Sequence, residues 1–457
     1  VDIVNNSWGY DEFFIDNKND ADAAPFFDAI SDALTLGRDG LGTIITFAAG
    51  NEAEIGDNVN YHSLANTPVT IAVGSYGQNG DASLFSTPGA AVLVSAPGEE
   101  IYTTDVTGVA GYNTGDYEPF FSGTSAATPI VTGVIALMLE ANPNLGYRDV
   151  QEILAYSSVN PTELDTGWQT NGANNWNGGG LTVSDQFGFG GVDAHAAVRL
   201  AETWVTQSTA TNVLTHVEDG TVPTAGFAFS DTLPFSTTIT VASADSLRID
   251  HVELSLDLDH TLLGDLVVEL VSPDGTSSIL MDKAGFGSFE GFGFLDSTFD
   301  SVQFWGEMSA GDWTINIDDT FEDNDGLINA FSLNFIGDEL SHIDSSNPTI
   351  GDDTYIFTDE WLRHGFEGGR GTILDDGGVD ALNFAAITTD ITFDLDNSNI
   401  NTLWGIPLLL ETSSTALAIF ENVFGGDGND NFFGNDANNE LVGARGADQL
   451  FGGAGND

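Results

Sequence analysis

Short apolar runs alternate with helix-like patterns along the first 200 residues. Residues 43–49, 69–74 and 91–96 are apolar on both faces, which is typical of strands in a parallel sheet covered on both sides. Residues 2–6 are predicted to form a further short buried strand, and residues 23–36 have apolar side chains at helical spacing. Strands that alternate with helices predict an α/β layer.

A serine stands directly before the most apolar segment of this region. Residues 130–140 are apolar almost all round, which predicts a helix buried in a core. Ser125 would then lie at the helix N-terminus, where free backbone N–H groups and the helix dipole favour negative charge. This placement suits a nucleophile whose transition state is an oxyanion. From the pattern alone, a Ser/Thr-rich cap on an ordinary buried helix is an equally good interpretation.

Several ordered motifs resemble those of subtilisin-like serine proteases of the kexin/furin-type proprotein convertase branch. They are Ser7-Trp8-Gly9, Gly40-Leu41-Gly42, Ala49-Gly50-Asn51 and Ser122-Gly123-Thr124-Ser125, followed by residues 136–145 and 187–194. The resemblance implies that Ser125 is the nucleophile and that Asn51 donates its side-chain amide to the oxyanion. It also implies that Ser7, Trp8 and Gly9 line a cleft and pair with an extended peptide.

A serine nucleophile also needs a general base and a residue that orients it. In subtilases the order along the chain is Asp, His, Ser. Only His62 precedes Ser125, and it follows Asn51 and lacks the Gly-Thr that comes after the family histidine. The resemblance therefore implies that the catalytic Asp and His lie upstream of Val1, and that the 457 residues alone are an inactive fragment.

The convertase branch binds Ca²⁺ beside its specificity pocket and cleaves after basic residues. By resemblance, Glu12 and Asp57 match two of the Ca²⁺ ligands. His62 stands where the branch has a pocket acid, which departs from the pattern for basic specificity. Either carboxylate could instead be ordinary solvated surface.

The pattern changes to partial alternation of apolar and polar residues after Trp204, and 273–276 (Pro-Asp-Gly-Thr) is a hairpin signal. These features predict an antiparallel β-sandwich. Its motifs resemble the P domain of proprotein convertases; they are Gly264-Asp265-Leu266, residues 270–276, Trp305-Gly306-Glu307 and Gly311-Asp312-Trp313. The resemblance implies a stabilising module without chemistry. Asp257, Asp265 and Asp318 are either Ca²⁺ ligands or ordinary carboxylates at turns and strand ends.

A nine-residue repeat occupies the end of the chain, beginning at Gly425, Gly434, Gly443 and Gly452. Its sixth positions are Asp430, Asn439, Asp448 and Asp457, and its eighth positions are Phe432, Leu441 and Leu450. This period resembles the RTX repeat of the parallel β-roll, in which sixth-position oxygens bind Ca²⁺ and eighth-position side chains fill the core. Upstream, Tyr355-Ile356-Phe357-Thr358 and residues 375–380 resemble the segment that precedes the repeats in serralysin-type proteases. A flexible Gly/Asn/Asp linker is the competing interpretation.

Composition narrows the possible partners. The chain has 70 Asp+Glu against 9 Lys+Arg, a net charge of -61, so nucleic acid and anionic membranes are poor partners, whereas Ca²⁺ is a favourable one. It has no cysteine, and no apolar run is as long as a membrane-spanning helix. The resemblance to RTX repeats implies an extracellular protein exported from a Gram-negative bacterium by type I secretion machinery. The truncated last repeat predicts that the protein continues beyond Asp457.

The sequence therefore predicts three regions: part of a subtilisin-like domain over 1–207, a P domain over 208–340 and an RTX region over 341–457. The leading functional hypothesis is a secreted, Ca²⁺-dependent serine endopeptidase that hydrolyses proteins through an acyl-enzyme on Ser125 and favours basic residues. The alternative is a non-catalytic binding or adhesion protein with a degenerate protease domain.

Overall fold

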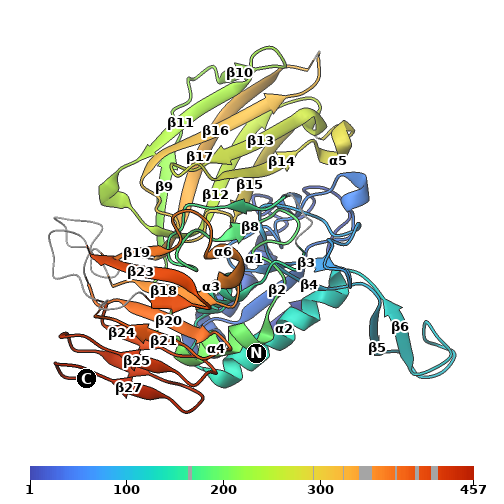
Figure 1. Cartoon of the computed structure of the whole chain (residues 1–457). Helices are drawn as coiled ribbons and strands as arrows, with labels where there is room; N and C mark the ends of the chain where they lie inside the picture. The colour runs from blue at the N-terminus through green and yellow to red at the C-terminus, as the bar shows by residue number, and fades with distance from the viewer. Residues whose placement is uncertain are drawn as a thin grey trace.

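The computed structural model describes residues 1–162, 167–291, 293–322, 324–338, 352–375, 378–396, 401–412 and 420–457. The chain forms an α/β layer, a two-sheet sandwich and a C-terminal stack of short parallel strands, which lie against one another (Figure 1). The predicted multidomain fold class is confirmed. The first residues of the predicted third region, 341–351, fall outside the described residues.

The α/β layer is a parallel sheet in the order β1-β2-β3-β4. Its elements are β1 (Ile3–Asn6), α1 (Ala24–Leu36), β2 (Ile44–Ala48), β3 (Ile71–Tyr76), β4 (Val92–Pro97), α2 (Thr124–Ala141), α3 (Tyr147–Ser157), the short pair β7 (Gln169–Thr170) and β8 (Thr182–Val183), and α4 (Ala194–Thr203). Strands β2, β3 and β4 are buried on both faces because helices and loops cover both sides of the sheet. The prediction that residues 2–6 form a buried strand is wrong in its burial, because β1 is an edge strand and stays partly exposed. The alternation of strands and helices along the sequence predicted this layer correctly.

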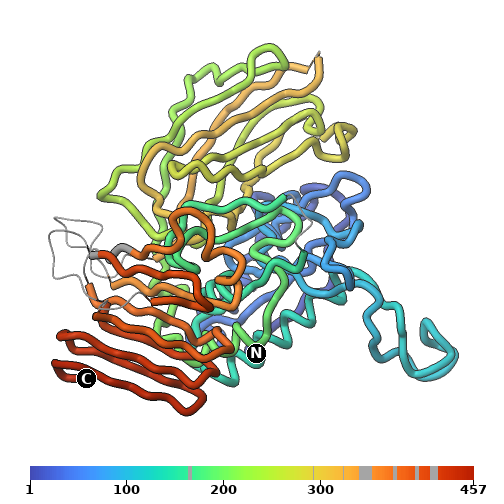
Figure 2. The backbone as a smooth tube through the Cα atoms, viewed as in Figure 1, coloured from blue at the N-terminus to red at the C-terminus, as the bar shows by residue number. Residues whose placement is uncertain are grey.

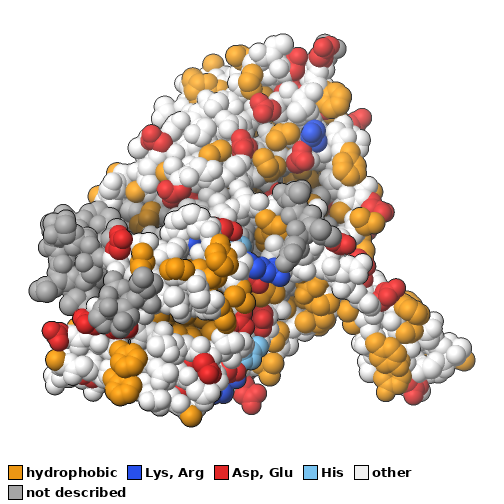
Figure 3. All heavy atoms as spheres, viewed as in Figure 1, with side chains coloured by type: hydrophobic (Ala, Val, Ile, Leu, Met, Phe, Trp, Pro, Cys, Tyr) orange, Lys and Arg blue, Asp and Glu red, His pale blue; other side chains and the backbone are white. Residues whose placement is uncertain are grey.

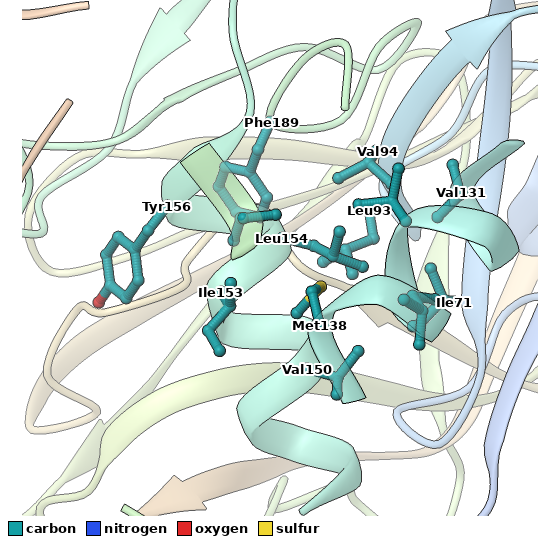
Figure 4. Packing of buried hydrophobic residues seen from close by; sticks show 14 of the residues in the cluster. Ile71, Leu93, Val94, Val131, Met138, Val150, Ile153, Leu154, Tyr156 and Phe189 are labelled. Atoms are coloured by element: carbon teal, nitrogen blue, oxygen red, sulfur yellow. The ribbon is translucent and has the colours of Figure 1, made fainter. Parts of the chain in front are cut away.

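Helix α2 packs along the sheet, and its apolar side chains enter a common core with α3 and α4. Val131 and Met138 of α2 meet Ile71, Leu93 and Val94 from the strands (Figure 4). Burial is not complete, contrary to the prediction, because Leu137 is half exposed on an outer stripe of the helix. By length and apolar content alone, α2 could also cross a membrane, a test that core helices of globular proteins pass as well.

An antiparallel hairpin of β5 (Ile101–Thr104) and β6 (Tyr117–Phe121) leads into α2. It projects away from the rest of the molecule (Figure 1), and its orange side chains are visible on the arm in Figure 3. Tyr102 and Tyr117 stack at 5.3 Å between ring centroids, although both side chains are exposed.

The sandwich has two antiparallel sheets, as predicted. One contains β9 (Leu214–Asp219), β10 (Phe227–Phe229), β12 (Arg248–Asp259), β15 (Phe294–Ser301) and β17 (Gly326–Asp338), and the other contains β11 (Phe235–Val241), β13 (Leu266–Val271), β14 (Ser277–Asp282) and β16 (Gly311–Asp319), with the short α5 (Ala284–Gly287) after β14. Trp313 and Phe335 are buried between the sheets.

The C-terminal region winds into parallel sheets, as expected for a β-roll (Figure 2). The order β18-β20-β24-β26 forms one face and β21-β25-β27 another; the strands are β18 (Thr354–Thr358), β20 (Ala381–Ala386), β24 (Asn422–Phe424), β26 (Glu440–Val442), β21 (Thr392–Asp394), β25 (Asn431–Phe433) and β27 (Gln449–Phe451). The short α6 (Trp361–His364) and the sheet of β19 (Thr372–Asp375), β22 (Asn401–Leu403) and β23 (Ile406–Thr412) complete the region.

Strands that pair in the repeats are two repeats apart. Val423 lies beside Leu441, and Phe432 lies beside Leu450. Phe432 is fully buried, whereas Leu450 is 43% exposed at the last turn. The core prediction for the eighth positions therefore holds where a further turn covers the side chain.

Candidate active site

Ser125 is the second residue of α2, and the helix begins from Gly123 rather than from a capping hydroxyl. Gly123 has a φ of 141°, a conformation that favours glycine. Ser125 therefore does not act as an N-cap, and its own N–H lies in the first helical turn, where backbone donors have no acceptor within the helix. This arrangement favours the nucleophile interpretation over the capping one.

Ser125 and Ser7 exchange hydrogen bonds across the sheet edge. Ser125 Oγ donates to the Ser7 carbonyl at 3.2 Å, and Ser7 Oγ donates to the Ser125 carbonyl at 3.0 Å. The pair places the Ser7–Gly9 segment beside the start of α2, where the sequence predicted the wall of a cleft.

Asn51 follows β2 and lies beside the same helix start. Its Oδ1 accepts hydrogen bonds from the Thr124 backbone N–H at 2.8 Å and from Thr124 Oγ1 at 3.1 Å. The amide oxygen is therefore occupied, and the amide nitrogen is the group left to donate. Thr124, which the sequence analysis did not single out, holds Asn51 in this orientation and also contacts Gly50.

A pocket lies between the Ser7–Gly9 segment and the end of β2. It is lined by Trp8, Gly9, Tyr10, Asp16, Phe47, Ala48, Ala49, Gly50, His62, Leu64 and Ala65. Most of this lining is apolar. The polar groups are the two buried side chains of Asp16 and His62.

His62 and Asp57 form a buried pair at this pocket. His62 Nε2 lies 2.9 and 3.0 Å from the two carboxylate oxygens of Asp57. Burial opposes the charge on the imidazole, but the hydrogen bond and the charge of Asp57 outweigh it and raise the pKa of His62. Within the described residues, His62 Nδ1 and Asp16 Oδ1 are buried without a hydrogen-bond partner.

The predicted Ca²⁺ ligands near this pocket have different surroundings. Asp57 is buried and engaged by His62, whereas Glu12 is exposed. Over the described ranges, no three His, Asp or Glu side chains gather as a metal site would require. The Glu12 and Asp57 assignment stays a prediction.

The histidines of the described chain pair with carboxylates away from Ser125. The pairs are His62–Asp57, His195–Asp427, His216–Glu218, His251–Asp300, His260–Asp319 and His364–Glu367. Ser125 Oγ instead donates to a backbone carbonyl. The described residues thus bring together the candidate nucleophile and the oxyanion donor without an imidazole on the nucleophile.

The three sandwich carboxylates stand on different elements: Asp257 on β12, Asp265 in the turn before β13, and Asp318 on β16. Asp257 accepts a hydrogen bond from Asn329 within the sheet of β12, and Asp318 is exposed on β16. Asp265 is buried near Asp319; burial and that neighbouring charge raise its pKa. The three side chains therefore do not share one site.

The sixth positions of the repeats turn their oxygens toward the loops of the roll. Asp448 Oδ1 accepts the N–H of Asp430 at 2.9 Å, and Asp457 Oδ1 accepts the N–H of Asn439 at 3.1 Å. Burial and the charges of Asp448 and Asp390 raise the pKa of Asp430 to about 6. No three carboxylates gather here among the described residues either, but a hard divalent cation near Asp430 and Asp448 would relieve their repulsion.

Three segments of the chain match known families. Residues 1–190 match the subtilase family, residues 249–335 match the proprotein convertase P-domain, and residues 424–457 match the RTX calcium-binding nonapeptide repeat (4 copies).

Relatives and solved structures agree with these matches. Kexin of Saccharomyces cerevisiae is 32% identical over 335 residues (71% of this chain, 39% of kexin), and human furin is 30% identical over 353 residues (74% of this chain, 41% of furin). The chain thus spans about two fifths of the length of these relatives. In fold it is similar to a serine protease of Aeromonas sobria, with a TM-score of 0.64, 22% identity and coverage of 73% of this chain and 71% of that one.

Proposed function

Because residues 1–190 belong to the subtilase family and precede a convertase-type P domain and RTX repeats, we propose that the protein is a serine endopeptidase. Ser125 would attack the peptide carbonyl and form an acyl-enzyme. The Asn51 amide and the Ser125 backbone N–H would stabilise the oxyanion. The proposed division of the chain places boundaries near residues 207 and 340.

One observation carries this proposal. Asn51 and Ser125 come from elements 74 residues apart, yet the Thr124 N–H bond to Asn51 places them at one helix start. An asparagine that served only to form the turn after β2 would not require this contact with α2. An imidazole must still reach Ser125 Oγ in the active protein, whereas among the described residues Ser125 Oγ donates to the Ser7 carbonyl.

Labelling with a fluorophosphonate, together with peptide hydrolysis, tests the proposal in the intact protein. Ser125→Ala should abolish both labelling and turnover while leaving the thermal unfolding midpoint nearly unchanged. Ser31→Ala, on the exposed face of α1, is the matched serine control and should behave as wild type. Equal activity in the Ser125→Ala protein would exclude the assignment.

The alternative is a binding or adhesion protein that retains a degenerate protease domain. The absence of an imidazole at Ser125 among the described residues favours it. A protein that binds peptides but neither labels at Ser125 nor turns them over would support this second function.

We propose further that the pocket accepts a basic side chain. Asp16 places a buried, unpaired carboxylate oxygen in it, within the part of the chain described. The two carboxyl groups of Asp16 and Asp57 stand against the single imidazole of His62, so acidic side chains outnumber basic ones there. An ammonium or guanidinium group would meet an acceptor there.

The remaining proposals concern calcium and location. Asp430, Asn439, Asp448 and Asp457 would hold Ca²⁺ between turns of the roll, where the ion would supply charge compensation and fold the loops. The RTX repeats also support export by type I secretion machinery into the extracellular medium, from a Gram-negative source. Circular dichroism in chelator and in millimolar Ca²⁺ should differ in the β-sheet region; identical spectra would contradict calcium-dependent folding.

A further inference from the structure

The β-roll lies directly against α4 of the subtilase region (Figure 1). Strand β20 contributes Ala385 and Ala386 to the same buried cluster as Ala197 and Leu200 of α4. Small side chains on both elements allow close approach. The contact therefore has an apolar centre, and burial of apolar surface supplies most of the free energy of such an interface.

Charged residues from two repeat loops lie beside this apolar centre. Asp427 accepts from Arg199 Nε at 2.7 Å and lies 2.9 Å from His195 Nε2. One roll turn further on, Arg445 donates to Glu202 at 2.6 and 2.8 Å. The hydrogen bond from Arg445 also lowers the pKa of Glu202.

The two loop residues occupy equivalent places in the repeat. Asp427 and Arg445 are both third positions, 18 residues apart, and they carry opposite charges. Their partners Arg199 and Glu202 are three residues apart on α4, which is the spacing of neighbours on one helix face. The charges therefore match in sign and in register, although exposed ion pairs individually contribute little stability.

Both loops also contain the predicted calcium positions. Residues 425–430 run from the first glycine to Asp430, and residues 443–448 run to Asp448. The loops are linked by the Arg445 N–H bond to the Gly426 carbonyl and by the Asp430 N–H bond to Asp448. An ion held by these loops would thus fix the side chains that contact α4.

Helix α4 is in turn attached to the helix that carries Ser125. Asn142, at the C-cap of α2, donates from Nδ2 to the carbonyls of Ala201 and Trp204, both at 3.0 Å. Those acceptors lie at the C-terminal end of α4, so Asn142 joins the two helices end to end.

We propose that the β-roll is an intramolecular docking partner of α4, and that calcium binding in the roll stabilises α4 and α2 through this contact. The inference rests on the proposed calcium binding and is independent of catalysis. The calcium-bound roll then stabilises the packing of α4 and α2, and this stabilising contact is termed the brace.

Hydrogen exchange of the full chain, followed by mass spectrometry in chelator and in Ca²⁺, tests the brace. In wild type, Ca²⁺ should slow exchange in the roll loops and, by roughly tenfold, in α4, a coupling within the usual range. Arg445→Glu and Glu202→Arg should each weaken the effect in α4, because each places like charges at the contact, while the roll still responds. The double variant, which restores opposite charges between positions 202 and 445 but loses the Arg199–Glu202 ion pair, should recover part of it.

Asp436 provides the matched control. It is the exposed third-position residue of the intervening repeat, and neither α4 charge pair involves it. Asp436→Lys should leave the α4 response as in wild type. A roll that responds to Ca²⁺ without slowing exchange in wild-type α4, or a double variant that does not recover, would overturn the brace; a roll that does not respond at all would overturn the calcium step itself.

Discussion

The backbone N–H of Thr124 donates a 2.8 Å hydrogen bond to Oδ1 of Asn51, joining the residue before the candidate nucleophile to the residue that follows β2 by three positions. The bond occupies the amide oxygen and leaves the amide nitrogen as the group that can donate, as the proposed oxyanion role requires. Because of this bond, the orientation of Asn51 depends on Thr124, and the two residues form one structural unit.

Substitution of Asn51 should separate its two roles. Asn51→Asp keeps the acceptor for Thr124 but loses the N–H donor, so kcat should fall about 10²–10³-fold with little change in stability. Asn51→Ala should lose a similar factor in kcat and, in addition, about 1 kcal/mol of unfolding free energy. Steady-state kinetics and urea unfolding provide the two readouts; an aspartate variant with wild-type kcat would contradict the oxyanion role.

Arg148 on α3 joins the α/β layer to the sandwich through buried charge. Its guanidinium donates to Asp250 at 2.9 Å and lies 2.8 Å from Asp338. Arg148→Met would leave two carboxylates uncompensated at the junction, so we expect a loss of about 3–5 kcal/mol. Urea unfolding measures it, and Lys283→Met is the exposed control, expected within about 0.5 kcal/mol of wild type.

The His62–Asp57 pair should make stability depend on pH. Because the folded protein holds the His62 proton more tightly than the unfolded chain, the pair contributes fully below about pH 6.5 and is lost as pH rises through the raised pKa of His62. Wild type should therefore lose more stability than His62→Gln as pH rises above 6.5. Parallel unfolding midpoints for the two proteins up to pH 9 would refute the contribution, and the partly exposed His216→Gln variant controls for general alkaline effects.

The sequence predicted the architecture well because its signals were local and repeated. Apolar runs indicated β2, β3 and β4, and the nine-residue period from Gly425 indicated β25 to β27. It did not predict that one stripe of α2 stays exposed, since composition alone does not show which neighbours a helix has. The sequence also did not predict contacts between residues that are far apart in the chain. Asp16 lines the pocket from a loop without a recognisable motif, and Thr124 orients Asn51, which is 73 residues away in the sequence.

The basic residues illustrate the same limit. Seven of the nine Lys and Arg side chains make contacts between different regions of the chain. They are Lys18, Arg148, Arg199, Arg248, Arg363, Arg370 and Arg445. The visible surface in Figure 3 is correspondingly scattered with acidic side chains and has few basic ones. Composition revealed the excess of acid, but only the structure shows that the scarce cations lie where regions meet.

Asp16 should determine the preference for basic side chains. Asp16→Asn removes the charge but keeps a side chain of similar size that can still accept the Leu64 N–H, a bond of 2.9 Å in the structure. We expect kcat/KM for Arg and Lys substrates to fall about 10–100-fold, as for a lost charge-assisted hydrogen bond, while Leu and Ala substrates change little. Equal losses for both substrate classes would indicate a structural role instead.

Asp448 should contribute directly to calcium affinity. It is a sixth-position residue whose Oδ1 already accepts the N–H of Asp430, so it joins adjacent loops of the roll. Asp448→Ala removes a charged oxygen ligand, and affinity depends on the number of such ligands, so the Ca²⁺ Kd should rise at least about tenfold. Asp436→Ala, an exposed third-position change, should leave the Kd unchanged. Isothermal titration calorimetry compares the two, and an equal Kd in both variants would place the calcium ligands elsewhere.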